Sequence, residues 1–206
     1  MRDQTISDFL DQLAAKVPAP GGGASAALHA GQAAALLGMV ARYSSGEKYR
    51  AHAATIDRVR DAADLLRDRA LQLAEDDAAA FTAVTDAYKL PRTSDVEKQT
   101  RSAAIASALA GAARPPADTI AAASRLVALA EELLPVGNRN VISDVAAATE
   151  AARAALTTGR VNVEINLGGI TDEKARAELA AVLAGVDAQV ARAEQVTAAV
   201  RKEIAK

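Results

Sequence analysis

Alanine dominates this sequence and limits the folds that are open to it. The chain has 54 alanines among its 206 residues, whereas only 2% of its residues are aromatic. Alanine has the highest helix propensity of the amino acids, so long alanine-rich windows favour helices strongly. Because an alanine side chain buries little apolar area, such helices gain stability mainly from close packing over a long distance. We therefore predict an all-α bundle of long antiparallel helices, assembled into a homodimer or a higher homo-oligomer.

Composition also excludes several classes of protein. The formal net charge is -2, from 24 Lys and Arg and 26 Asp and Glu, so the chain lacks the basic footprint of a nucleic-acid-binding protein. The absence of cysteine excludes disulfides, thiolate nucleophiles, zinc fingers and iron–sulfur clusters. Neither a signal-peptide core nor a run of about 18 apolar residues is present. We expect a cytoplasmic protein without nucleic-acid or membrane partners, folded as a single domain over residues 1–206.

Proline, glycine and capping residues divide the chain into helical segments. Thr5-x-x-Asp8 and Ser94-x-x-Glu97 have the spacing of capping boxes. The segment 24–43 is apolar on nearly all sides, which predicts a buried helix at the centre of the bundle. The predicted helices cover residues 5–17, 24–43, 50–90, 94–114, 117–134, 143–158 and 171–204.

One short segment, 161–167, has a different pattern. Its apolar residues alternate with Asn162, Glu164 and Asn166, which is the period of two typical of a strand. The pattern predicts an extended segment that lies over the bundle or pairs across a subunit boundary. The two asparagine amides then either bind a polar heterocycle or face water.

A glycine-rich loop precedes the central helix. Pro20 is followed by Gly21, Gly22 and Gly23, and Ser25 comes just after the loop. Unpaired N–H groups and the positive end of the helix dipole make such a terminus suitable for an anion. The alternative is a tight turn between two packed helices.

Asp77 interrupts an apolar seam on the longest predicted helix. It lies between Leu73 and Val84 at heptad-like spacing. Because an unpaired buried carboxylate is costly, a seam aspartate is usually hydrogen-bonded, protonated or functional. Asp77 is therefore a candidate catalytic acid, unless it is a satisfied core residue or the seam drifts and exposes it.

A second polar cluster contains Asn138, Asn140 and Asp144. Asp144 is either an ordinary N-cap, which contributes about 1 kcal/mol, or a carboxylate at the mouth of a pocket. The two histidines, His29 and His52, are far apart and lack metal-ligand spacing, so we predict no metal site.

Several motifs in order resemble one known family. They are VPAPGGGASAAL at 17–28, GEKY at 46–49, EDDAAAF at 75–81, GNRNVISD at 137–144 and VNVEINL at 161–167. The chain resembles the cyclodeaminase domain of formiminotransferase-cyclodeaminase in its stand-alone form. The resemblance covers nearly the whole chain, and it implies an all-helical oligomer that acts on one-carbon derivatives of tetrahydrofolate.

The resemblance also implies roles for individual residues. The carboxylates of Asp77 and Asp144 match catalytic positions of the family. Two residues differ from the family pattern, because His29 and Gln32 occupy positions where small or apolar residues are expected. The remaining matches imply a substrate-binding set, comprising Gly21, Gly22, Gly23, Ser25, Lys48, Tyr49, Asn138, Asn140 and Asn166.

The expected activity is formation of 5,10-methenyltetrahydrofolate and ammonia from 5-formiminotetrahydrofolate. In this interpretation Asp77 transfers protons, Asp144 assists it or binds the pterin, and the glycine loop with Lys48 receives the glutamate tail. The first alternative is a methenyltetrahydrofolate cyclohydrolase. The second, from another class, is a non-catalytic folate-binding or helical interaction protein. We expect no tightly bound cofactor, with the tetrahydrofolate derivative as substrate.

Overall fold

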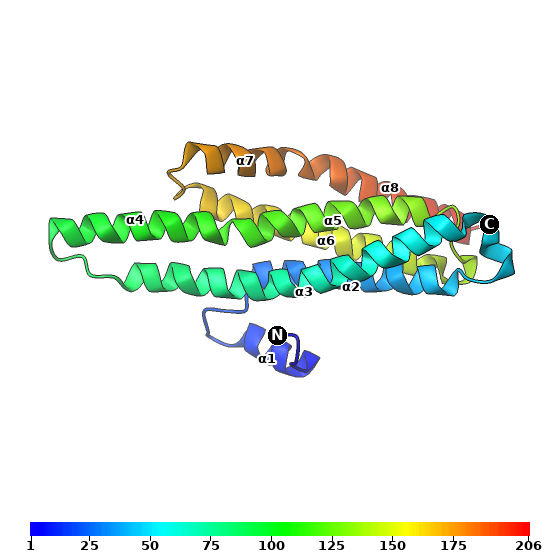
Figure 1. Ribbon diagram of the computed structural model, residues 1–206, viewed down its shortest axis with the longest axis horizontal. Coiled ribbons are helices and arrows are strands. Elements are labelled where there is room, and N and C mark those ends of the chain that lie inside the picture. Colours follow the sequence, from blue (N-terminus) through cyan, green and yellow to red (C-terminus); the bar gives the residue numbers. More distant parts are fainter.

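The computed structural model describes residues 1–206 as an all-α bundle, which confirms the predicted fold class. Long helices run side by side along the longest axis of the molecule, and the short helix α1 lies outside the main bundle (Figure 1). The helices are α1 (Ile6–Ala14), α2 (Gly22–Tyr43), α3 (Ala53–Lys89), α4 (Asp95–Ala112), α5 (Arg114–Leu133), α6 (Ile142–Leu167), α7 (Glu173–Ala184) and α8 (Val186–Ile204), with short 3-10 turns at η1 (Glu47–His52) and η2 (Arg139–Val141).

Helix α2 lies at the centre of the bundle, as its composition predicts. It packs against α3, α6 and α5, and 12 of its 22 residues are buried. By length and composition α2 is also apolar enough to cross a membrane, although the sequence predicts no membrane-spanning segment. Because 56% of its apolar window is buried by other helices, it has the character of a core helix.

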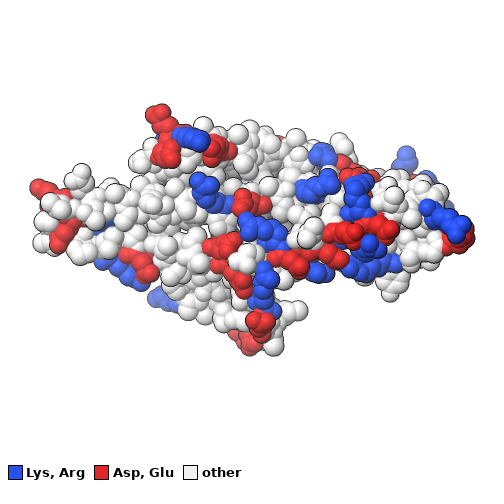
Figure 2. Space-filling view, in the orientation of Figure 1, with Lys and Arg blue, Asp and Glu red and all other residues white.

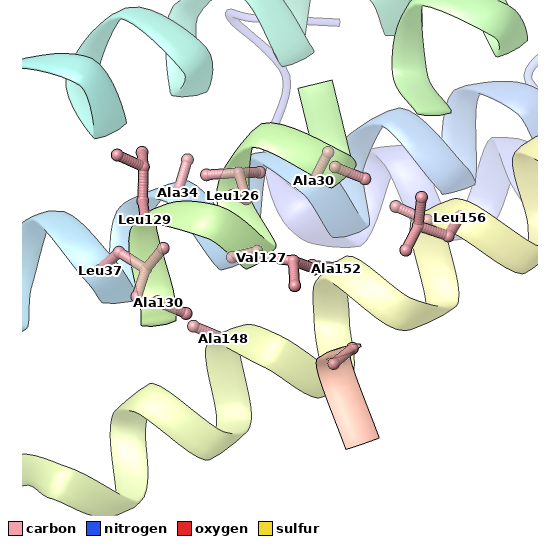
Figure 3. Packing of buried hydrophobic residues seen from close by; sticks show 14 of the residues in the cluster. Ala30, Ala34, Leu37, Leu126, Val127, Leu129, Ala130, Ala148, Ala152 and Leu156 are labelled. Atoms are coloured by element: carbon pink, nitrogen blue, oxygen red, sulfur yellow. The ribbon is translucent and has the colours of Figure 1, made fainter. Parts of the chain in front are cut away.

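Small residues let the central helices approach one another closely. The main core cluster contains 32 buried residues, and its leucines fill the spaces between facing alanines (Figure 3). This alternation of large and small side chains allows dense packing with almost no aromatic residue. Residues drawn in the close-up include Ala34, Leu37, Leu126, Leu129, Ala148, Ala152 and Leu156.

Gly159 marks a close approach of α6 to α5. A Cβ atom at this position would lie 2.9 Å from Ile120 Cγ1 and 3.2 Å from the Pro116 carbonyl oxygen. Gly159→Ala should therefore lower the free energy of unfolding by about 1–3 kcal/mol through overpacking. Gly111→Ala is the matched control, because nothing lies within 4 Å of its Cβ position and alanine is the better helix former. Urea unfolding curves measure both, and equal stability of the two variants would contradict the close approach.

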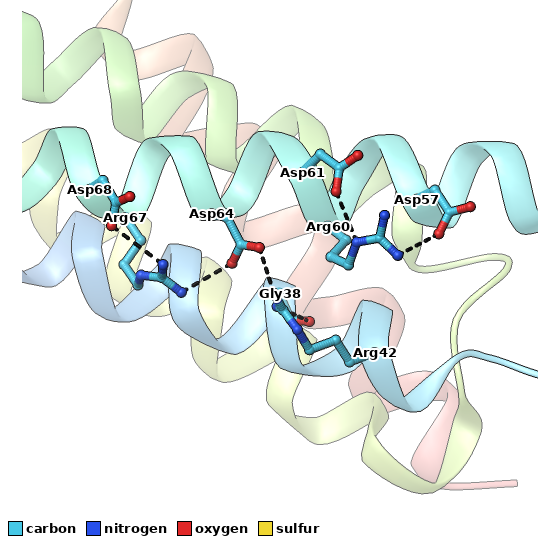
Figure 4. Close-up of polar contacts among 8 residues, drawn as sticks. All are labelled: Gly38, Arg42, Asp57, Arg60, Asp61, Asp64, Arg67 and Asp68. Carbon is cyan, nitrogen blue, oxygen red and sulfur yellow. Dashed lines mark hydrogen bonds and ion pairs between the residues drawn. The ribbon is translucent and has the colours of Figure 1, made fainter.

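Charged side chains of both signs cover the outer side of α3. Arg60 pairs with Asp57 and Asp61, and Arg42 of α2 reaches Asp64 with an Nη2–Oδ2 distance of 2.5 Å (Figure 4). Acidic and basic groups are intermingled across the visible face of the molecule (Figure 2). Exposed pairs of this kind contribute about 0.2–1 kcal/mol each, so the bundle depends chiefly on its apolar core.

The prediction of an extended segment at 161–167 is wrong, because α6 continues as a helix through Leu167. The alternating pattern does not match burial: Val163 is fully buried, whereas Val161 and Ile165 are 60% and 79% exposed. The Asn162 and Asn166 side chains each donate to the backbone carbonyl four residues earlier, at 2.8 Å. Packing of α6 against α2, α5 and α8 therefore overrides the strand-like local pattern.

Two predicted helix ends also differ from the structure. The first helix stops at Ala14 rather than Val17, and it buries none of its residues. The predicted last helix is divided at Gly185 into α7 and α8. Both predicted capping boxes are present, at Thr5 and at Ser94, because their hydrogen bonds depend only on residues three apart.

Candidate functional site

The glycine loop, α3 and α6 converge at the N-terminus of α2. Gly21 is the N-cap of α2 and has extended backbone angles, and its carbonyl accepts the Ser25 N–H at 3.0 Å. The N–H groups of the first turn have no partner within their own helix. This terminus therefore offers N–H donors to groups outside α2, as the sequence predicts.

The Asp77 carboxylate of α3 lies directly against this terminus. A Cβ atom at Gly23 would be only 1.9 Å from Asp77 Oδ1 and 2.4 Å from its Cγ. The Ala24 N–H faces the carboxylate closely enough to lower its pKa. Only glycine at position 23 leaves room for this contact, so the loop and the acid form one unit.

Burial raises the pKa of Asp77 above its ordinary value of 3.8. The Ala24 N–H stabilises the carboxylate and lowers the pKa, but the loss of hydration is the larger effect. A carboxyl group with a raised pKa exchanges protons more readily near neutral pH than an exposed aspartate does. Asp77 thus has the electrostatic character of a general acid or base.

Asn162 and Asn166 extend the site along α6. A Cβ atom at Gly22 would lie 3.3 Å from Asn162 Nδ2, so the Asn162 amide faces the glycine loop. Both asparagines use their side-chain NH2 groups to bond carbonyls of α6. Their side-chain oxygens remain available to accept N–H groups of a polar ligand.

Asn162 is the residue of this group that sequence reasoning left out of the site. The strand-like pattern predicts only that its polar residues either bind a polar heterocycle or face water. The spacing of four between Asn162 and Asn166 was the available signal, because it places both amides on one face of a helix.

The other predicted site residues lie at the opposite end of α2. The Asn138 amide donates to the Tyr43 carbonyl at 2.8 Å, and its Oδ1 accepts the Asn140 N–H at 3.0 Å. Lys48 lies over the Tyr49 ring, with 5.4 Å between Nζ and the ring centroid. Asn138 therefore has a clear structural role, since it joins the loop before α6 to the end of α2.

Within one chain, Asp144 lies far from Asp77. Asp144 lies in the first turn of α6, whereas Asn162 is 18 residues further along this helix. At about 1.5 Å per residue the two positions are about 27 Å apart. A single pocket that joins the two carboxylates within one chain is therefore excluded. Ser25 lies on α2 two residues after Gly23, which contacts Asp77, but it lines a groove between α1 and α2 that Asp77 does not line.

The chain is similar to proteins of one family along most of its length. The family model described as Formiminotransferase-cyclodeaminase matches residues 5–184. A methenyltetrahydrofolate cyclohydrolase of Methylorubrum extorquens is 38% identical over 177 residues, which are 85% of this chain and 85% of that protein. The formimidoyltransferase-cyclodeaminase of Rattus norvegicus is 30% identical over 194 residues, which cover 92% of this chain but only 36% of the rat protein.

One solved structure has the same fold as this chain over its entire length. The crystal structure of formiminotetrahydrofolate cyclodeaminase from Thermotoga maritima has a TM-score of 0.87 and 30% sequence identity. The match covers 100% of this chain and 99% of that chain. Together with the family match, it confirms the resemblance that the ordered motifs indicate. The chain belongs to the formiminotransferase-cyclodeaminase family.

Proposed function

We propose that this chain is a tetrahydrofolate enzyme that forms or opens the five-membered ring of 5,10-methenyltetrahydrofolate. The observation that carries the proposal is the Asp77 carboxyl group, partly buried and held against the N-terminus of α2. Ring formation and ring opening both require protons to move at a nitrogen of the ring. Asp77 supplies a group that accepts and returns such a proton.

Hydrolysis of the methenyl compound is the first reaction to test. Water attacks the methenyl carbon while Asp77 removes a proton from the water. The bond from that carbon to N5 then breaks, and N5 takes up a proton. The product is 10-formyltetrahydrofolate, with one proton released overall. This reaction is favoured by the higher identity of the cyclohydrolase relative, 38%, over a similar share of both proteins.

The cyclodeaminase reaction is the second candidate. There N10 of 5-formiminotetrahydrofolate attacks the formimino carbon, and its proton passes to the nitrogen that leaves as ammonia. Asp77 relays this proton in our proposal. The match to the Thermotoga maritima cyclodeaminase over the whole chain supports this alternative.

In both reactions the polar groups around α2 hold the substrate. The Asn162 and Asn166 side-chain oxygens accept pterin N–H groups, and the free N–H groups at the α2 terminus bind an anionic part of the substrate. By holding the reacting atoms of the substrate close together, these groups contribute to the rate in addition to proton transfer. We expect no tightly bound cofactor, because both reactions proceed by proton transfer and addition alone.

Absorbance of 5,10-methenyltetrahydrofolate distinguishes the two reactions. Purified protein is added to the methenyl compound in one sample and to 5-formiminotetrahydrofolate in another, each beside an uncatalysed control. We expect accelerated loss of the methenyl compound in the first sample. Product formation with ammonia release in the second would instead assign the cyclodeaminase activity. No acceleration in either sample would overturn the proposal and favour a folate-binding protein without turnover.

A further inference from the structure

One face of helix α3 packs against α2 as far as the candidate site. Along this face Ala63, Ala70 and Asp77 recur every seven residues, and each lies within 4 Å of the Cβ position of a glycine of α2. Ala63 and Ala70 are fully buried there. The contact ends at Asp77, because α2 begins at Gly22, whereas α3 and α4 continue beyond that point as a hairpin (Figure 1). The last turns of α3 therefore have no α2 helix beside them.

Two aromatic residues, Phe81 and Tyr88, continue this face beyond the end of α2. Phe81 follows Ala63 by 18 residues and Tyr88 follows Ala70 by the same number, and 18 residues make five full turns of an α-helix. Each aromatic side chain therefore leaves α3 in the direction in which the corresponding alanine meets α2. With no α2 helix to cover them, Phe81 and Tyr88 are 46% and 53% exposed. We call the surface around these two residues the open α3 face.

Arg101 of α4 places a positive charge at the far end of the open α3 face. Its Nη2 and Nε donate to the Tyr88 carbonyl at 3.1 and 3.3 Å, and its guanidinium lies over the Tyr88 ring, with 5.4 Å between Cζ and the ring centroid. The ion pairs of the hairpin join Lys89 to Asp86 and Lys98 to Asp95, and neither includes Arg101. Because a guanidinium carries five N–H donors, Arg101 retains donors for an anion.

We propose that the open α3 face binds the p-aminobenzoyl-glutamate tail of the tetrahydrofolate substrate. The Phe81 ring packs against the benzoyl ring of the tail, and the Arg101 guanidinium binds its terminal carboxylate. Tyr88 holds the guanidinium in place through its ring and its carbonyl. This inference rests on the proposed function, since it concerns the part of the same substrate that extends away from Asp77.

The length of the open α3 face suits this tail. At about 1.5 Å per residue, Phe81 lies about 6 Å and Tyr88 about 16 Å beyond Asp77 along α3. In the substrate the benzoyl ring is bonded directly to N10, and with bonds of about 1.4 Å the terminal carboxylate of an extended tail lies about 12 Å from N10. When N10 lies beside Asp77, the benzoyl ring is therefore level with Phe81. The terminal carboxylate then comes within reach of the long Arg101 side chain, which ends over the Tyr88 ring.

The order of chemical groups on the open α3 face matches their order in the tail. An aromatic ring comes first and a cation second, as the benzoyl ring and the glutamate carboxylates require. Aromatic rings attract one another in offset or edge-to-face contact, and a guanidinium binds a carboxylate through parallel hydrogen bonds. The opposite direction along α3 is closed, because Ala70 packs on Gly31 of α2. Lys48, which the family resemblance suggests for this tail, lies beyond the other end of α2 within one chain.

Removal of the Arg101 charge tests the carboxylate contact by equilibrium binding. Folic acid and pteroic acid are the probes, because they differ only in the glutamate. We expect Arg101→Gln to weaken the binding of folic acid about tenfold in calorimetry and to leave that of pteroic acid within about twofold. Arg176→Gln, exposed on α7, is the matched control and should change neither. If Arg101 served only to hold the end of α3, both ligands would weaken alike. That result, or no change for either ligand, would overturn the proposal.

Phe81→Ala tests the position of the benzoyl ring. Both probes contain this ring, so we expect the dissociation constants of folic acid and pteroic acid to rise together, by about five- to tenfold. Val96→Ala removes an exposed apolar side chain from the same hairpin, and it should leave both constants unchanged. Unchanged binding of both probes to Phe81→Ala would contradict the proposed path of the tail.

Kinetics separates a failure of this inference from a failure of the proposed function. With the methenyl compound as substrate, Arg101→Gln should raise KM and leave kcat nearly unchanged, because the lost contact is remote from the reacting atoms. Turnover by the wild type with an unchanged KM in Arg101→Gln would exclude the tail contact and leave the proposed function standing. Absence of turnover in the wild type would overturn the proposed function, whereas a selective loss of folic acid binding in Arg101→Gln would still support a site for such a tail.

Discussion

Replacing Asp77 with asparagine should lower turnover of the tetrahydrofolate substrate about 10²–10⁴-fold and leave the bundle folded. Asparagine has nearly the same shape and still offers an oxygen to the Ala24 N–H, but it cannot carry a proton between substrate atoms. The measurement is kcat for the methenyl compound, with circular dichroism as the check on folding. We expect KM to change much less than kcat, because the variant retains the contacts that bind substrate.

Asp76→Asn is the matched control for this prediction. Asp76 is the next residue of α3, but its carboxylate accepts from Gln72 Nε2 at 2.9 Å and lies away from the glycine loop. Its replacement should leave kcat within about twofold of wild type, since surface substitutions away from a site have small effects. A loss of activity as large as that of Asp77→Asn would mean that the effect is not specific to proton transfer.

The raised pKa of Asp77 also predicts the direction of a stability change. The folded chain holds the Asp77 proton to a higher pH than the unfolded chain does. The contribution of Asp77 to stability therefore falls as the pH rises from its ordinary pKa of 3.8 through the folded pKa. Since asparagine does not ionise, Asp77→Asn should be at least as stable as wild type near neutral pH. Urea unfolding at several pH values checks this, and a large destabilisation at neutral pH would show that the charged carboxylate stabilises the fold.

The second large effect is expected for Gly23→Ala. The new methyl group would overlap Asp77 Oδ1, since the two positions are only 1.9 Å apart. Either the carboxylate or the first turn of α2 must move, and a displacement of about 1 Å in an active site can lower the rate about 10²-fold. We expect a loss of at least that size in kcat/KM.

Gly21→Ala provides the comparison within the same loop. No atom lies within 4 Å of the Cβ position of Gly21, and its φ of −141° is accessible to alanine. This variant should keep most of the activity. Similar losses of kcat/KM for Gly21→Ala and Gly23→Ala would indicate loop flexibility as the cause. That result would contradict the proposal that the contact between Gly23 and Asp77 determines the rate.

The helices could be predicted because their causes are local. Alanine favours helix at nearly every position, and the capping boxes at Thr5 and Ser94 depend on residues three apart. Asp77 could also be identified as a candidate from nearby residues, because it is a carboxylate among apolar residues that recur at helical spacing. The identity of the family was accessible for a similar reason, because its motifs occur in order along one chain.

The structure of the segment 161–167 could not be predicted from its local sequence pattern. Its alternation of apolar and polar residues has the period of a strand, yet it forms the last two turns of α6. Long-range packing of Val163 into the core outweighs that pattern. Asn162 was missed as a consequence, because its place beside Gly22 depends on the helical course of α6.

By itself the sequence determined the all-α fold, the central position of α2 and the candidate acid Asp77, since propensity, burial pattern and capping act over a few residues. Only the tertiary structure decided which of the candidates meet. It joins Gly23, Asp77 and Asn162 from three helices, and it places Asp144 about 27 Å from Asn162 along a rigid helix. The physical reason is that side chains distant in sequence meet only through helix packing, which depends on the shapes of all the helices together.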